Sequence, residues 1–249
     1  MSLYKWQLKY LIAGAAILPF APLLYLQGRL TRRRVGILPG AGGAITGQIG
    51  EGDNASSLLV IGESTVAGLG ARTHERALAG QFARRLHERM GRPVRWTVVG
   101  KNGVTARRTV IDLIPKVPDK AFDHILVGLG GNDVIKLSSP VKWRRDMTVL
   151  LTILRNKNPH ASIFLSNCPM IRLSPAIPQP IKSILWELSK MHDANIKEAT
   201  ASMDRVFYYH QPRDLDIDGF FADGIHPSEK GYSDWAEAMM NFFDANYKW

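Results

Sequence analysis

The chain is 249 residues long, 45% hydrophobic and 22% charged, which is ordinary for a globular protein and enough for one sizeable hydrophobic core. A single cysteine, Cys168, excludes an intramolecular disulfide, and no zinc-ligand, helix-turn-helix or RNP-like pattern points to nucleic acid. The net charge of +10 does not point there either, because residues 1–35 hold six basic residues and no acidic one, which leaves +4 for the rest.

An uncharged, largely apolar segment covers residues 10–26, with Lys5 and Lys9 before it and four arginines between positions 29 and 34 after it. About 20 apolar residues cross a bilayer core, so this segment is just long enough. We expect residues 1–35 to form a helical membrane anchor that contacts lipid through residues 10–26. By the positive-inside rule, the larger number of basic residues after the segment places the rest of the chain in the cytoplasm.

Three other roles for this segment stay open: a cleaved signal peptide, a monotopic or re-entrant hairpin, and a buried core helix. No small-x-small cleavage site follows the segment, which disfavours a signal peptide. Pro19 and Pro22 kink a helix by removing backbone donors, which keeps the hairpin open. Residues 36–55 are rich in glycine and lack helical periodicity, so we expect a flexible linker or a loop lying on the domain of residues 56–249.

From residue 56 onward, short apolar runs alternate with amphipathic ones. The short runs predict buried strands at residues 57–62, 94–99, 124–130, 162–167 and 205–210. The amphipathic runs predict helices at residues 75–90, 105–114, 143–156, 181–203 and 227–246. Continuous apolar strands separated by helices indicate a parallel sheet covered on both faces. The sequence therefore predicts a three-layer α/β/α fold with a five-stranded parallel sheet, preceded by an N-terminal hydrophobic helix.

Ser64 follows the first predicted strand, in the sequence VIGESTVAG. A serine hydroxyl must be exposed and must lose its proton to a base before it can act as a nucleophile, and a strand-end turn gives the exposure. Asp223 and His226 lie three residues apart in one loop, where the imidazole can act as the base while the carboxylate orients it. The alternatives are that Ser64 caps a helix, that Asp223 only bonds turn amides, and that His226 is a surface residue.

Two further motifs follow predicted strands. GLGGNDV, residues 128–134, places Asn132 in a glycine-rich turn, where its amide can donate to an oxyanion or cap the turn. KNGVTARR, residues 101–108, precedes a helix whose first backbone N–H groups can supply another oxyanion donor. Ligands of open α/β sheets bind at the carboxyl ends of the strands, so we expect these motifs to meet in one cleft.

Taken together, GES with Ser64, the NGVTA turn, GGND with Asn132 and DGIH with Asp223 and His226 resemble the four ordered blocks of the SGNH/GDSL hydrolases. The resemblance extends from the first strand to the last helix and implies the flavodoxin-like fold of that family. It implies that Ser64 is the nucleophile and donates its backbone N–H to the oxyanion hole. It also implies that Asn132 is a second oxyanion donor, that His226 is the base and that Asp223 orients it.

The chain departs from the family pattern at two places. The second block of the family ends in a glycine whose N–H lines the oxyanion hole, and Ala106 stands there in this chain, with Gly103 as the alternative donor. Since the donor is a backbone group, alanine can serve where φ is negative. Glu63 replaces the usual aspartate of the G-D-S motif, a change that we expect to matter little.

The resemblance to the SGNH/GDSL hydrolases implies an acyl-ester or lipid substrate, and we expect no cofactor. No pair of histidines has metal-site spacing beside carboxylates, so we expect no metal. An anchored domain meets lipids at high local concentration, which favours an esterase or a lysophospholipase-type lipase. The loop at residues 168–181, with Trp143, Phe220 and Phe221, either forms an acyl pocket or fills the core. An acyltransferase on the same triad and a catalytically silent membrane-tethered scaffold are the alternatives.

Overall fold

The computed structural model describes residues 3–212 and 216–248. Its strands form one six-stranded sheet in the order β1-β3-β2-β4-β5-β6. Five of the strands run parallel, and these are β2 (Ser56–Gly62), β3 (Val94–Gly100), β4 (His124–Gly128), β5 (Ser162–Leu165) and β6 (Val206–Tyr208). They match the five predicted strands, so the predicted α/β fold around a parallel sheet is confirmed.

The sixth strand, β1 (Thr46–Ile49), lies in the segment that was expected to be a linker or a loop on the domain. It pairs antiparallel with β3, with Thr46 opposite Thr97. Gly47 is needed there because a Cβ at this position would lie 2.3 Å from the Trp96 ring. Further along the segment, Ala41 N–H donates to the Ala67 carbonyl at 2.9 Å. Strand β1 is therefore fastened to the edge of the sheet, and Ala41 is fastened to the turn that carries Ser64.

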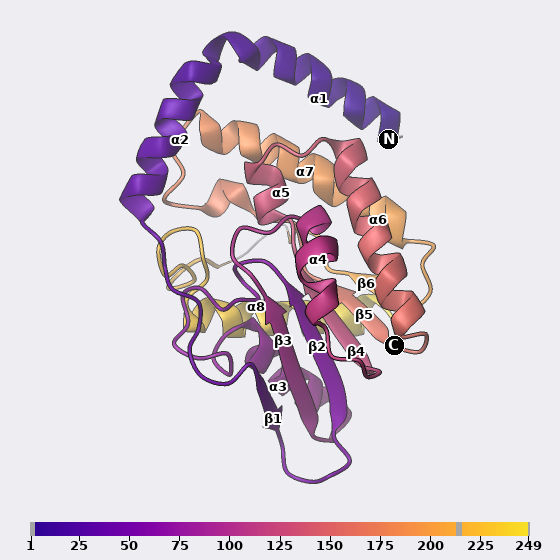
Figure 1. Cartoon of the computed structure of the whole chain (residues 1–249). Helices are drawn as coiled ribbons and strands as arrows, with labels where there is room; N and C mark the ends of the chain where they lie inside the picture. The colour runs from indigo at the N-terminus through magenta and orange to yellow at the C-terminus, as the bar shows by residue number, and fades with distance from the viewer. Residues whose placement is uncertain (1–2, 213–215, 249) are drawn as a thin grey trace.

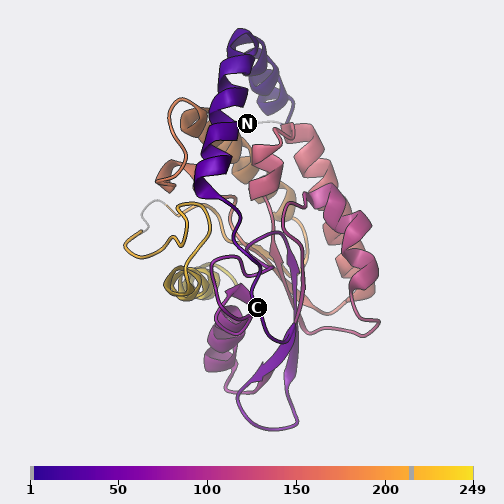
Figure 2. The ribbon, with the colours of Figure 1, turned by 60° about the vertical axis from the view of Figure 1, so that its left-hand side comes forward.

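Helices cover both faces of the sheet (Figure 2). On one face lie α3 (Leu78–Met90) and α8 (Glu229–Asn246), and on the other lie α4 (Ala106–Asp112), α6 (Pro140–Lys157) and α7 (Ile181–Thr200). Successive strand residues point to opposite faces, so Val60 and Phe164 pack in the core cluster beneath α3 and α8, while Ile61 and Ile163 pack in the cluster beneath α4, α6 and α7. The fold has the three layers that the sequence predicts.

The N-terminal segment forms α1 (Leu3–Ile17), the 3₁₀ turn η1 (Leu18–Phe20) and α2 (Ala21–Val35). By length and composition this stretch, Leu3–Val35, is the one helix of the described residues that is long and apolar enough to cross a membrane. It bends at η1, where Pro19 interrupts the helical hydrogen bonds, and α1 and α2 form an arch over α7 (Figure 1). The segment is therefore an anchor or a signal sequence.

Candidate active site

Asp223 and His226 form a hydrogen-bonded pair in the loop before α8. Asp223 Oδ2 lies 2.8 Å from His226 Nδ1, while Asp223 Oδ1 accepts the backbone N–H groups of Ile225 and His226 at 2.9 and 2.7 Å. Burial alone would raise the pKa of Asp223, but the hydrogen bonds from His226 and from the two backbone N–H groups outweigh it and lower that pKa. An ionised Asp223 holds the Nδ1 proton, which leaves Nε2 of His226 able to accept a proton.

Ser64 lies in the tight turn that follows β2, but only 7% of its surface is exposed, so the turn does not give the exposure that the sequence predicts. Its carbonyl accepts the Leu69 N–H at 3.1 Å, which folds the chain back toward the loop of His226. Gly70 has a φ of +92°, and a Cβ there would lie 2.1 Å from the carbonyl oxygen of Pro227. The turn that carries Ser64 therefore packs directly against the residue that follows His226.

Glu63 joins the Ser64 turn to the turn of Asn132, although the sequence analysis expected its replacement of aspartate to matter little. Its Oε1 accepts the Gly131 N–H at 2.7 Å, and its Oε2 accepts both the backbone N–H of Asn132 at 2.8 Å and the Asn132 side-chain amide. Burial raises the pKa of Glu63 to about 7, even though these hydrogen bonds favour the ionised form. The Asn132 amide has two N–H groups, so the bond to Glu63 orients it and leaves one N–H for an oxyanion.

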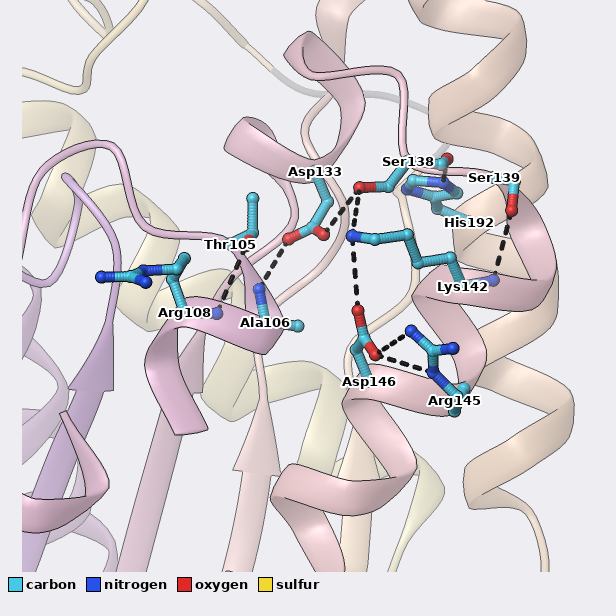
Figure 3. Close-up of polar contacts among 10 residues, drawn as sticks. All are labelled: Thr105, Ala106, Arg108, Asp133, Ser138, Ser139, Lys142, Arg145, Asp146 and His192. Carbon is cyan, nitrogen blue, oxygen red and sulfur yellow. Dashed lines mark hydrogen bonds and ion pairs between the residues drawn. The ribbon is translucent and has the colours of Figure 1, made fainter. Parts of the chain in front are cut away.

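The backbone N–H of Ala106 is already hydrogen-bonded. That N–H donates to Oδ2 of Asp133 at 2.8 Å, inside the protein, and Ser138 Oγ donates to the other oxygen of Asp133 at 3.1 Å (Figure 3). Asp133 is fully buried, and burial raises its pKa. The expectation that Ala106 lines the oxyanion hole is therefore corrected, because its donor is already satisfied.

Gly103, the alternative donor, lies in the turn between β3 and α4. Its φ is +82°, its carbonyl accepts Lys136 Nζ at 2.6 Å, and the described part of the chain holds no hydrogen bond from its own N–H. Nothing lies within 4 Å of the place where a Cβ would stand. Gly103 therefore stays a candidate for the third oxyanion donor.

Comparisons with known proteins identify the family of the chain. The model of the GDSL-like lipase/acylhydrolase family matches residues 60–233. The chain belongs to this family. A GDSL-like esterase of Mycobacterium tuberculosis is 25% identical over an alignment of 194 residues that covers 74% of this chain and 60% of that protein.

Solved structures of esterases and lipases share the fold of this GDSL-family chain. The lipase Lip_vut3 from a goat rumen metagenome has a TM-score of 0.60 and 16% identity, over 78% of this chain and 98% of that chain. An acetyl xylan esterase, Est2A, from Butyrivibrio proteoclasticus has a TM-score of 0.54 and 16% identity, over 78% and 65% of the two chains. The present chain thus spans less than two thirds of the mycobacterial esterase and of the xylan esterase.

The expected acyl pocket of this GDSL-family chain is only partly where the sequence placed it. Trp143 is 1% exposed, stacks on His192 at 5.0 Å and belongs to the core between the sheet and α6, so it is withdrawn as a pocket residue. Phe220 is also buried, with its ring 5.1 Å from that of Phe221. Phe221 is half-buried and pairs with Pro227, next to His226, so it alone of the three stays a pocket candidate.

A cavity of about 400 Å³ that the sequence analysis missed borders the Ser64 turn of this family member. Its lining includes Ala67 from that turn, the end of β3, Leu113 and the buried His74. The loop at residues 168–181 packs against the loop of Asp223 and His226, where Ser174 Oγ donates to the Gly224 carbonyl at 2.6 Å. Cys168 is buried and burial raises the pKa of its thiol, which makes it a poor nucleophile.

Proposed function

We propose that this GDSL-family chain is a carboxylic ester hydrolase that works through an acyl-enzyme on Ser64. His226 Nε2 takes the proton of Ser64 Oγ as that oxygen attacks the ester carbonyl, and Asp223 stabilises the imidazolium that results. His226 then gives the proton to the leaving alkoxide, which departs as the alcohol. Water, deprotonated by the same imidazole, cleaves the acyl-enzyme and releases the acid and free Ser64.

The observation that carries this proposal is the 2.8 Å contact between His226 Nδ1 and Asp223 Oδ2, on a loop that packs against the Ser64 turn. If Asp223 only stabilised the turn, its Oδ1, which accepts both backbone N–H groups, would be sufficient. Its Oδ2 instead contacts the His226 imidazole, as an orienting carboxylate does. The oxyanion of the tetrahedral intermediate is stabilised by the Ser64 N–H and by the Asn132 amide. Glu63 keeps that amide in place, and Gly103 supplies the third N–H.

We propose an acyl ester or a lipid ester as the substrate. The family is one of lipases and acylhydrolases, and the similar proteins include an esterase, a lipase and a carbohydrate esterase. The cavity beside Ala67 borders the nucleophile turn but is not lined by Ser64, Asn132 or His226, so we do not assign it as the acyl pocket. The apolar residues 10–26 associate the enzyme with membrane lipids, and the basic flanks favour the cytoplasmic side.

A fluorophosphonate probe tests the nucleophile directly, because it phosphonylates an activated serine. The wild type and Ser202→Ala, a matched change at an exposed serine, should both be labelled, and Ser64→Ala should not. Labelling that persists in Ser64→Ala contradicts the assignment. If the wild type and both variants stay unlabelled, the result favours a catalytically silent scaffold.

Product analysis then distinguishes the remaining activities. A chain-length series of p-nitrophenyl esters beside lysophospholipids identifies the acyl group that the enzyme accepts. The hydrolase should release free acid whether or not an acceptor alcohol is present. A new ester that replaces the free acid when the alcohol is added would identify an acyltransferase.

A further inference from the structure

Both ends of the apolar N-terminal segment are hydrogen-bonded to the same catalytic domain. Near its start, the Tyr10 hydroxyl donates to the Leu137 carbonyl at 2.8 Å. Directly after its end, the Gln27 amide donates to the Gln179 carbonyl at 2.6 Å. Leu137 follows the short helix α5 (Gly131–Ile135), and Gln179 ends the loop before α7.

These two hydrogen bonds distinguish a segment that spans the membrane from one that stays on one side of it. A straight helix over residues 10–26 would be about 25 Å long, close to the hydrocarbon thickness of about 30 Å that a spanning helix must cross. A spanning helix therefore places Tyr10 and Gln27 at opposite surfaces of the membrane. One catalytic domain lies on one side only, so it cannot bond both residues while the segment spans.

The faces of α1 and α2 that point toward the catalytic domain pack against it. Half-buried residues recur at helical spacing, as Trp6, Tyr10 and Ala13 on α1 and as Leu24, Gly28 and Thr31 on α2. Trp6 and Tyr10 pack against a small apolar cluster that includes Val134, Leu185 and Met191. α2 lies against the start of α7 here, since a Cβ at Gly28 would make an ordinary van der Waals contact of 3.8 Å with Ile181 Cδ1.

The outward faces have no partner among the described residues and suit a lipid surface. Around the bend, six apolar side chains are each more than half exposed: Leu11, Ile12, Leu18, Phe20, Leu23 and Leu26. Exposed arginines follow on α2, at positions 29 and 32–34, and the first 35 residues contain no acidic side chain. Exposed apolar side chains around a bend, with a basic flank and no acidic residue, suit insertion of the bend into an anionic membrane surface.

We propose that α1, η1 and α2 form a monotopic hairpin that lies within one leaflet of an anionic bilayer and does not cross it. The bend enters the acyl region, the arginines contact acidic headgroups, and the inward faces stay docked on α6 and α7 (Figure 1). This inference rests on the membrane association proposed above and adds its geometry. It replaces the spanning anchor that the length of the apolar segment alone predicts.

Labelling with a membrane-impermeant maleimide tests the topology in spheroplasts that express the full chain. Single cysteines are introduced by Lys5→Cys and Arg33→Cys, on either side of the segment, and by Asp119→Cys on an exposed loop of the catalytic domain, all in Cys168→Ala. If the segment is a hairpin, all three cysteines lie on the same side of the membrane. The three variants should then be labelled alike in intact spheroplasts, and alike again after permeabilisation. Opposite labelling of Lys5→Cys and Asp119→Cys would show a spanning helix and overturn the proposal.

Vesicle binding of the full chain tests the lipid contact. The protein should sediment with phosphatidylcholine vesicles that contain phosphatidylglycerol, and less so without it or in high salt. Phe20→Glu should weaken binding about tenfold or more, whereas Ile111→Glu, at an exposed apolar residue of α4, should not. Equal binding of these two variants would overturn the proposal. Mass spectrometry of the intact protein is a second check, because a mass that lacks residues of the hairpin would show that the segment is cleaved and would also overturn it. Fluorophosphonate labelling of the same samples reports separately on the hydrolase.

Discussion

Glu63→Gln should change how the stability of the protein depends on pH. Burial raises the pKa of Glu63 from 4.5 to about 7, so between these values the native state holds a proton that the unfolded chain has released. The contribution of Glu63 to stability is therefore complete below pH 4.5 and is lost as the pH rises to 7. One pKa unit corresponds to about 1.36 kcal/mol, so the ionised form costs the native state about 3 kcal/mol.

Glutamine cannot ionise, so this slope disappears in the variant. The unfolding free energy of Glu63→Gln minus that of the wild type should rise by about 3 kcal/mol between pH 4.5 and 7.5, whatever constant cost the lost hydrogen bonds add. Urea unfolding followed by the fluorescence of the six tryptophans measures it, and Glu51→Gln, on an exposed turn, corrects for the lost charge. A difference that stays flat or falls with pH would refute the reasoning.

Two further substitutions separate catalysis from folding, and a third tests the packing of the Ser64 turn. His226→Ala should lower kcat by several orders of magnitude with little change in Tm, measured on the same preparation, because Ser64 then lacks its base. Asn132→Ala should lower kcat about 10²- to 10³-fold in steady-state assays with KM nearly unchanged, since its hydrogen bond strengthens as charge develops on the oxygen. Gly70→Ala should cost more in thermal melts than the roughly 1–3 kcal/mol of its left-handed backbone and should reduce activity, because its Cβ would also meet the Pro227 carbonyl oxygen at 2.1 Å. Gly91→Ala, also at positive φ but with open space around it, measures the backbone cost alone.

The sequence by itself determined the central sheet and the identity of the candidate catalytic residues. Buried parallel strands must be apolar throughout, so their runs stand out without knowledge of their partners. Strand β1 was missed because it has four residues, is partly exposed and pairs position 46 with position 97. An edge strand of this kind is defined by its neighbour more than by its own composition.

Tertiary structure alone decided which polar groups meet. The Glu63 carboxylate bonds residues 68 and 69 positions away, and the Ala106 N–H is satisfied by Asp133, 27 positions away. A hydrogen bond needs its donor and acceptor within about 3 Å, and motif spacing does not carry that precision. The N-terminal segment follows the same division. Its length and apolar composition are properties of the sequence, but only the fold returns both Tyr10 and Gln27 to one domain.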